Sequence, residues 1–363
     1  MTIYYIMSNL SRPRSRSRPR SRSRSVSNSS PSQLILDLLK TCKFGIEFES
    51  CFCISENNTI VNNNRDKVLD ILVKKFNKFS CNTEFNLVKD TDEFENDNSP
   101  NKYKVWNIVE DLSLGCDTGN SEFLYYTKKG MKTKKSNNVD IQTCSNNELF
   151  NSAEFISPVY DFPEGILELG KIFNNCFNNN IIFEVNRSQG FHINISSSLM
   201  NGETMMYKLN MLRFIKAWWY FEDVFFKLVD ISRCNLRGAG TYCAPLRKQF
   251  TDYQDIENRW EKFYMNSMLK KETVNKESKH MALSVKDNRF EIRIIEGTAD
   301  ITLMLNWIVL LNYFMISTLI KDIPSLEYNT PEKKFVLLFT YFLPQNDSNV
   351  KKIYKYFRDK FRI

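Results

Sequence analysis

The segment from Phe44 to Glu49 most constrains what this chain can fold into. Its sequence, Phe-Gly-Ile-Glu-Phe-Glu, alternates apolar and polar residues, which is the pattern of a β-strand. Alternation places Glu47 and Glu49 on one face of that strand, roughly 6.6–6.8 Å apart. Two carboxylates fixed on one face of a rigid strand can hold a divalent metal ion. They can equally form the solvated side of an amphipathic strand, and the segment alone leaves both interpretations open.

Apolar periodicity predicts a mixture of strands and helices along the chain. Helices are predicted at 33–40, 65–79, 162–178, 203–230, 252–269, 301–321, 331–342 and 350–361. Further strands are predicted at 104–109, 122–126, 153–157, 181–185, 191–195, 281–285 and 290–295. The strands 181–185 and 191–195 are predicted to pair around residues 187–190, and the polar stretches 90–102 and 127–147 to form loops. Strands joined mainly by hairpins or single helices predict an α+β fold with a largely antiparallel sheet.

The N-terminal residues 1–31 differ in composition from the rest of the chain. Residues 11–25 repeat Arg and Ser with two prolines, and the segment contains seven of the arginines and no acidic residue. Repulsion between like charges, with almost no apolar residue to bury, predicts a disordered arm. The arm carries nearly all of the net charge of +8, so residues 32–363, predicted as one domain, are close to neutral. Its role stays open between a solubilising tail, a targeting or phosphorylated segment, and a contact with RNA or an acidic partner.

A second charged strand is predicted from Arg289 to Glu296. Phe290, Ile292 and Ile294 share one predicted face, while Glu291 and Arg293 share the other. A carboxylate and a guanidinium on a central strand are costly to bury unless they pair or bind a ligand. They therefore predict either an internal ion pair, or a metal ligand beside an arginine that suits phosphate oxygens.

Two other predicted strands carry isolated polar residues among apolar ones. His192 and Asn194 alternate with Phe191, Ile193 and Ile195, and Glu154 lies between Ala153 and Phe155. If these strands share a sheet, then Glu47, Glu49, Glu154, Glu291, His192 and Arg293 line one concave face. Carboxylates crowded in this way repel unless cations separate them. Hard oxygen ligands favour Mg²⁺ or Mn²⁺ over zinc, and Mg²⁺ beside an arginine is typical of nucleotide phosphate chemistry.

The sequence lacks several common nucleotide- and metal-binding motifs, and it disfavours a membrane location. The sequence has no P-loop, no G-x-G-x-x-G fingerprint and no C-x-x-C pair among its nine cysteines. Reduced, structural thiols are predicted, together with an intracellular location, in the cytoplasm or the nucleus. The apolar stretch 301–319 is long enough to span a membrane. Because it contains Asn306 and Asn312 and follows the second charged strand directly, a buried helix is the preferred interpretation, and no membrane association is expected.

The order of these segments resembles the amidoligase family, which belongs to the glutamine synthetase/glutamate–cysteine ligase type of carboxylate–amine ligases. The resemblance covers about residues 43–320 and leaves the arm and the C-terminal helices at 330–362 outside. Each motif is short, but all follow the family's order. The matching motifs are FGIEFE at 44–49, WNIVEDLSL at 106–114, AEFISP at 153–158, GFHIN at 190–194, SR at 232–233, YCAP at 242–245 and FEIRIIEGT at 290–298.

The resemblance implies an antiparallel sheet that forms a funnel flanked by helices, and ATP- and Mg²⁺-dependent amide or peptide bond formation through an acyl phosphate. ATP, a carboxylate substrate and an amine substrate (amino acid, peptide or protein side chain) are then the expected partners. The implied metal ligands are Glu47, Glu49, Glu154 and Glu291. Arg293, His192 and Glu291 are the implied catalytic residues, and Arg293, His192 and Asn194 are the implied contacts of the nucleotide. Asp111 and Arg233 are implied on the substrate side.

One position departs from the family pattern. Where the family often has G-x-H-x-H, this chain has Asn194 in place of the second histidine. Asparagine carries no charge, so a phosphate contact or proton transfer made there would weaken. This departure and the basic arm favour an alternative function: a weak or inactive amidoligase-fold protein whose arm, through residues 11–25, binds RNA or acidic partners.

Overall fold

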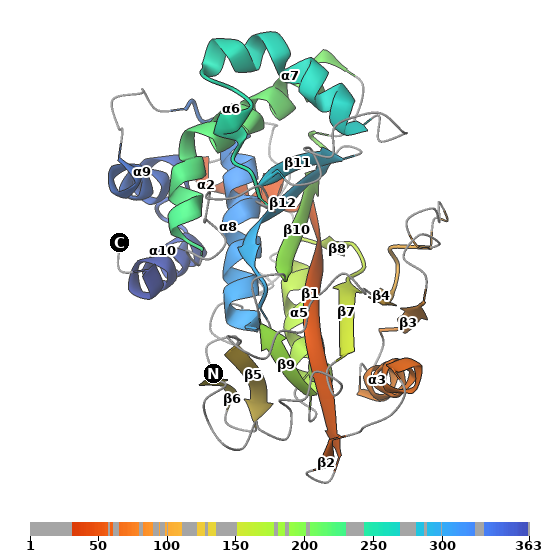
Figure 1. The fold of residues 1–363 in the computed structure, drawn as a ribbon. Helices are drawn as coiled ribbons and strands as arrows, with labels where there is room; N and C mark the ends of the chain where they lie inside the picture. Colours follow the sequence, from red (N-terminus) through yellow and green to blue (C-terminus); the bar gives the residue numbers. More distant parts are fainter. Residues whose placement is uncertain are drawn as a thin grey trace, which may run out of the picture.

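The computed structural model describes the chain in segments that together form one α+β arrangement (Figure 1). The described residues are 31–56, 59–60, 65–79, 83–89, 94, 99, 101–110, 122–127, 130–135, 151–177, 181–185, 189–200, 204–229, 243–268, 281–286, 289–298, 300–323 and 330–361. The basic arm lies outside these residues, so its predicted disorder and its predicted partners stay predictions.

In the part of the chain that the structure describes, twelve strands form one sheet, whose main path runs β11-β12-β10-β1-β7-β4-β3. The strands are β1 (Cys42–Glu56), β2 (Thr59–Ile60), β3 (Phe85–Val88), β4 (Trp106–Glu110), β5 (Glu122–Thr127), β6 (Gly130–Lys135), β7 (Asn151–Ile156), β8 (Tyr160–Asp161), β9 (Ile181–Val185), β10 (Gly190–Ser197), β11 (Leu283–Lys286) and β12 (Arg289–Glu296). Among the strand pairs of the described residues only β3 and β4 run parallel, so the predicted α+β class and largely antiparallel sheet are confirmed. Sequence alternation missed four short strands, β2, β3, β6 and β8.

Eight helices accompany the sheet in the described part of the chain. They are α2 (Pro31–Leu39), α3 (Arg65–Phe79), α5 (Glu164–Ile172), α6 (Met205–Lys227), α7 (Tyr253–Met268), α8 (Ile301–Ile320), α9 (Pro331–Leu337) and α10 (Ser348–Phe361). Short π-helical turns at Phe173–Phe177 and Leu338–Phe342 continue α5 and α9, so the predicted helices 162–178 and 331–342 each divide into two parts.

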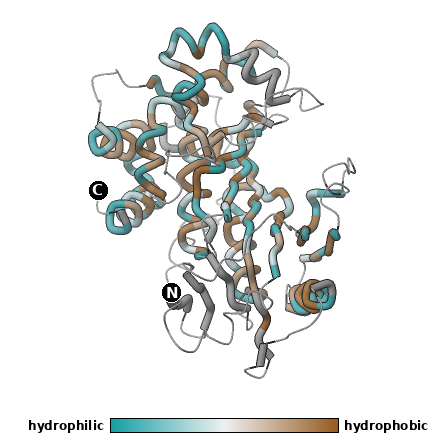
Figure 2. Tube along the Cα trace, viewed as in Figure 1, coloured by the Kyte–Doolittle hydropathy of each residue, from teal (hydrophilic) through white to brown (hydrophobic). Residues whose placement is uncertain are grey.

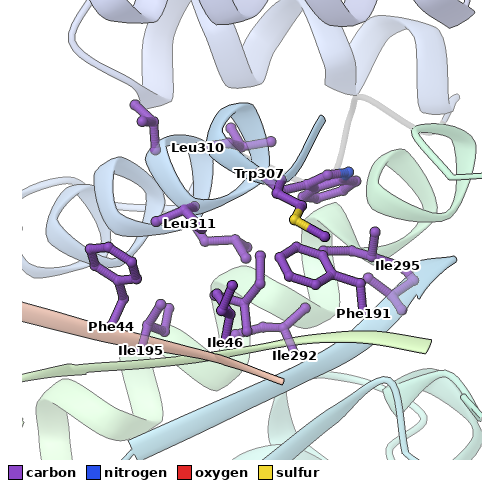
Figure 3. Packing of buried hydrophobic residues seen from close by; sticks show 14 of the residues in the cluster. Phe44, Ile46, Phe191, Ile195, Ile292, Ile295, Trp307, Leu310 and Leu311 are labelled. Carbon is purple, nitrogen blue, oxygen red and sulfur yellow. The ribbon is translucent and has the colours of Figure 1, made fainter. Parts of the chain in front are cut away.

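The core lies between one face of the sheet and α8. Phe44 and Ile46 of β1, Phe191 and Ile195 of β10, and Ile292 of β12 point toward α8, and all are buried (Figure 3). Hydrophobic residues gather along this part of the molecule (Figure 2). The even-numbered residues of β1 therefore face the core, and its odd-numbered residues, Glu47 and Glu49 among them, occupy the opposite face.

Helix α8 is the apolar stretch that is long enough to span a membrane. In the structure 89% of the apolar stretch of this helix is buried inside the protein. The helix packs against α2, α5, α6, α10 and β10. The side-chain amide nitrogens of Asn306 and Asn312 donate within the helix, to the carbonyl oxygens of Thr302 and Ile308. The prediction of a buried core helix is confirmed.

One predicted pairing is wrong. Strands β9 and β10 do not pair with each other; both pair with β1, one after the other along the same edge. β1 has 15 residues, which is long enough to take β10 at residues 42–48 and β9 at residues 51–54. Glu49 lies between these two ladders, beside Gly190 at the start of β10.

The cysteines differ in state along the described chain. Cys42, Cys176 and Cys243 are free and buried, as predicted for structural thiols. Burial raises the pKa of the Cys42 thiol to about 12, which keeps it protonated and unreactive. Cys51 is disulfide-bonded, so the prediction of reduced thiols is wrong at that position.

A buried carboxylate anchors the 3₁₀ turn at Leu246–Lys248 to α6. Glu222 is 1% exposed and accepts hydrogen bonds from the backbone N–H groups of Leu246 (2.6 Å) and Arg247 (3.1 Å) and from the indole of Trp218 (3.2 Å). Burial raises the pKa of Glu222 from its ordinary 4.5 to about 7, because these hydrogen bonds only partly offset the loss of water around the charge.

This carboxylate predicts a specific pH dependence of stability. Between pH 4.5 and 7 the folded protein retains a proton on Glu222 that the unfolded chain releases, so stability falls as pH rises through that window. Across that pH window we expect this group to remove on the order of 3 kcal/mol from the free energy of unfolding. Urea unfolding at several pH values should show a flatter profile for Glu222→Gln than for the wild type. Glu164→Gln, at an exposed residue that begins α5, is the control, and identical profiles for all three proteins would contradict the prediction.

Candidate metal and nucleotide site

Four strands bring the predicted site residues onto the face of the sheet opposite α8. Cross-strand register sets Glu47 of β1 opposite His192 of β10, and Glu49 of β1 opposite Glu154 of β7. Asn194 of β10 pairs in turn with Glu291 of β12. Directly opposed residues lie within about 4.5–5.5 Å of each other at their Cβ atoms, so the register alone forces these side chains together.

A β-bulge sets the position of Arg293. Phe191 pairs with Ile295, but Ile193 pairs with Ile292, so β12 places both Arg293 and Ile294 opposite the single residue His192. The bulge shifts the alternation, and Ile295 rather than Ile294 continues the core face beside Phe191. The prediction that Ile294 shares a face with Phe290 and Ile292 is wrong for this reason, since bulges re-aim side chains without leaving a mark in apolar periodicity.

The polar residues form two overlapping groups with metal-ligand spacing. Ligand atoms of Glu47, His192 and Glu291 all lie within 4.8 Å of one another, and so do those of Glu49, Glu154 and His192. His192 is shared, and its Nδ1 lies 3.5 Å from Oε2 of Glu47. His192 and Glu291 are 2% and 1% exposed, whereas Glu47, Glu49 and Glu154 are half-buried at the surface of the group.

Arg293 lies among the carboxylates. Its Nη1 donates to Oε1 of Glu291 at 2.9 Å, and its side chain is 18% exposed. Burial by itself lowers the pKa of Arg293, but the attraction of Glu291, Glu47, Glu49 and Glu154 outweighs it and the pKa is raised. One guanidinium balances only one of these four carboxylates. The group therefore carries excess negative charge, which divalent cations would neutralise.

Neighbouring groups hold two of the carboxylates in place. The side-chain amide of Asn194 donates to Oε1 of Glu47 at 2.8 Å, and the backbone N–H of Gly190 donates to Oε2 of Glu49 at 2.7 Å. The second bond comes from the first residue of β10. Each bond fixes one oxygen of its carboxylate and thereby orients the other, as outer groups do around metal sites.

A glycine allows the chain to pass close to the start of β10. Gly297 follows β12 and donates its N–H to the carbonyl oxygen of Gln189 at 3.1 Å. A Cβ at position 297 would lie 2.6 Å from the Cβ of Gln189, closer than real Cβ contacts allow. The absence of a side chain at Gly297 therefore allows the end of β12 to approach Gln189, the residue just before Gly190.

The structure brings together all of the predicted metal and nucleotide residues that it describes: Glu47, Glu49, Glu154, His192, Asn194, Glu291 and Arg293. Asp111 and Arg233, predicted on the substrate side, lie outside the described residues. Arg289 is the main residue that sequence reasoning missed. It shares the alternation of Glu291 and Arg293, so period-2 spacing could have identified it, and its Nε donates to Oδ1 of Asn194 at 3.1 Å.

The donor set fits a hard divalent cation. Four carboxylates supply oxygen atoms. The two groups, as far as the described residues form them, include one histidine and no cysteine, which disfavours a soft metal site. Carboxylates on neighbouring strands can bridge or share ions such as Mg²⁺ and Mn²⁺. A guanidinium beside such ions provides a fork for phosphate oxygens.

Comparison with known proteins places the chain in a family. No curated protein matches the sequence. The chain is similar to a solved structure, a bifunctional glutathione synthetase from Pasteurella multocida, with 12% sequence identity and a TM-score of 0.41. The match covers 91% of this chain and 48% of the synthetase, so this chain spans about half the length of the synthetase. At this level of likeness neither fold nor activity transfers. A family model described as "Putative amidoligase enzyme" matches residues 40–315, which include every residue of the site. The chain belongs to the amidoligase family.

Proposed function

We propose that the protein is an ATP- and Mg²⁺-dependent ligase that joins a carboxylate to an amine. The family supports a ligase of this class, and the arrangement of four carboxylates around Arg293 supports ATP as a substrate and Mg²⁺ as its cofactor. The same arrangement supports a sheet funnel of the glutamine synthetase/glutamate–cysteine ligase type. The observation that carries the proposal is the pair of overlapping ligand groups on the open face of the sheet.

In this proposal Glu47, Glu49, Glu154 and Glu291 hold the metal ions, with His192 between the two groups. Bound Mg²⁺ supplies charge neutralisation for the triphosphate and for the phosphoryl group in transfer. Arg293 orients the γ-phosphate through its planar fork, while Glu291 holds the guanidinium in place. The bulge in β12 aims this arginine toward the carboxylates rather than along the sheet.

The reaction follows from the poor reactivity of a carboxylate, whose leaving group would be an oxide. The substrate carboxylate attacks the γ-phosphorus of ATP, and the bond to ADP breaks to give an acyl phosphate. The amine then attacks the acyl carbon, phosphate leaves with the carbon–oxygen bonding pair, and the amine releases a proton. The protein binds and orients the reactants through these two steps.

Asn194 has a positioning role in this proposal. Its amide already donates to Glu47 and accepts from Arg289, so both ends of the side chain are occupied by protein groups. This differs from the nucleotide contact that the family resemblance implied. The departure from a second histidine therefore leaves the ligand groups and Arg293 in place, which favours an active enzyme over the inactive binding protein.

Trapping with hydroxylamine tests the proposal. The full chain is incubated with ATP, Mg²⁺, hydroxylamine and a panel of carboxylic acids, and hydroxamate and ADP are measured. We expect hydroxamate that requires ATP, an acid and Mg²⁺, and that disappears with EDTA. Folded protein that binds ATP but yields neither hydroxamate nor ADP with any acid would overturn the proposed activity.

A further inference from the structure

A cavity of about 220 Å³ lies among the C-terminal helices, between the π-helical turn Leu338–Phe342 and α10. Helix α10 packs against α8 and α9 packs against α6, both away from β1 and β7 (Figure 1). The family model ends at residue 315, so no residue of the cavity falls within the family match. The cavity is lined by Phe339, Thr340, Gln345, Val350, Lys351 and Tyr354.

The floor of the cavity is aromatic and aliphatic. Phe339 and Val350 are buried, and Tyr354 is half-buried with its ring centre 5.3 Å from that of Phe339. A cavity of about 150 Å³ with such a lining holds a benzene molecule, so about 220 Å³ is enough for one aromatic side chain. Pockets for drug-sized ligands begin at roughly 300 Å³. The cavity therefore fits a single ring rather than a nucleotide.

Polar groups surround the mouth of the cavity, where Thr340, Gln345 and Lys351 are exposed. The hydroxyl of Thr340 donates to the carbonyl oxygen of Val336 at 2.8 Å, which leaves its own oxygen able to accept a hydrogen bond. Neither the amide of Gln345 nor the ammonium of Lys351 makes a hydrogen bond or ion pair with the described residues. A few such polar groups around an apolar floor are typical of a binding site, where they orient the ligand.

The outer face of α10 is positively charged beside the cavity. Lys351, Lys355 and Arg358 follow one another at spacings of four and three residues, which places them on one face of the helix, and all three are exposed. Arg358 pairs with Asp359 at 2.7 Å, but Lys351 and Lys355 have no ion pair within the part of the chain that the structure describes. No acidic residue of that part lines the cavity. Charge complementarity therefore favours a ligand with acidic groups next to its ring.

We propose that this cavity docks an acidic peptide segment of a partner protein, anchored by one aromatic side chain. The ring packs against Phe339 and Tyr354, and neighbouring acidic residues pair with Lys351 and Lys355, which lie about 6 Å apart along the axis of α10. These cations and the exposed Val336, one turn before the mouth of the cavity, continue the contact surface beyond the cavity itself. A peptide covers this extended surface, whereas a single aromatic acid does not.

A blocked pentapeptide with phenylalanine between two pairs of glutamates tests the assignment. Its binding to the full chain is measured by calorimetric titration in EDTA, so that metal ions at the sheet take no part. We expect it to bind about 10- to 100-fold more tightly than the same peptide with alanine in place of phenylalanine, because the burial of the ring is lost. Replacing the glutamates with glutamines should weaken binding about 5-fold at low salt, and this difference should vanish at about 1 M salt.

Variants of the protein locate the binding site. Thr340→Trp fills the mouth of the cavity from an exposed position and should remove the advantage of phenylalanine over alanine, whereas Thr340→Ser should keep it. Lys351→Gln/Lys355→Gln should reduce the advantage of glutamate over glutamine. The matched control is Lys171→Gln/Lys248→Gln, which removes the same charge at exposed lysines that do not line the cavity. The arginine-rich arm also attracts acidic peptides, so only differences from this control are assigned to α10.

Several results would overturn the proposal. Equal binding of the phenylalanine and alanine peptides, or a preference that survives Thr340→Trp, means that the ring does not enter the cavity. A glutamate advantage as large in Lys351→Gln/Lys355→Gln as in its control removes the acidic part of the assignment. Free 3-phenylpropionate that binds as tightly as the peptide makes the ligand a small aromatic acid. Dimers in sedimentation that Thr340→Trp abolishes make the partner a second copy of this chain. Hydroxamate formation, which tests the ligase, is independent of all these results.

Discussion

The variant Glu154→Gln is expected to melt at a higher temperature than the wild type in EDTA and to lose at least about 100-fold of the ligase activity. Glu154 lies directly opposite Glu49 in the sheet, and like charges in this position destabilise a strand pair by roughly 0.2–1 kcal/mol. Neutralising one of them relieves that repulsion. The same change removes a proposed metal ligand, and a loss of about 2.7 kcal/mol in transition-state stabilisation corresponds to the 100-fold decrease.

Thermal melting with and without Mg²⁺ measures both halves of this expectation. Mg²⁺ should raise the melting temperature of the wild type, since a ligand that binds only the folded state stabilises it, and the rise should be smaller for Glu154→Gln. Glu164→Gln changes the same residue type at the exposed start of α5 and should leave both values unchanged. An unchanged Mg²⁺ response in Glu154→Gln would show that Glu154 does not contribute to a metal site.

The fold class and the gathering of the site residues on one face of the sheet were predictable, because both follow from the alternation of apolar and polar residues within single strands. Glu47 and Glu49 keep their period-2 spacing along β1, and Glu154, His192 and Glu291 each interrupt an apolar run on the opposite face from the core. Burying the apolar face against α8 leaves these polar residues only one shared surface. The family's motif order then indicated that the strands belong to one sheet.

The register between strands and the bulge were not predictable in the same way. The pairing of β9 with β1 depends on the length of β1 and on the break between its two ladders at Glu49, and neither is a local property. The extra residue in β12 left Ile294 and Ile295 both buried, so apolar spacing could not reveal which one faces α8. Alternation could place Arg289 on the face of Glu291, but its hydrogen bond to Asn194, 95 residues away in the sequence, depends on the register between β10 and β12.

Replacing Arg293 with methionine is expected to have the largest effect on stability. The change removes the partner of Glu291, which is 1% exposed, and leaves the other carboxylates without their shared counter-charge. Breaking a buried ion pair by removing one partner costs about 3–5 kcal/mol in the free energy of unfolding. Urea unfolding in EDTA measures this loss, and Arg259→Met, at an exposed arginine on α7, is the matched control.

Two further measurements show whether the cost comes from uncompensated charge. The double variant Glu291→Gln/Arg293→Met should recover part of the loss, because it removes the buried carboxylate that Arg293 neutralises along with the arginine. Mg²⁺ should stabilise Arg293→Met more than the wild type, since the ion replaces a positive charge among the same oxygen atoms. Activity should not return in either case, because neither restores the planar fork proposed to orient the γ-phosphate. A double variant less stable than Arg293→Met alone, together with an unaltered Mg²⁺ response, would mean that Arg293 acts through packing rather than as the counter-charge of the carboxylates.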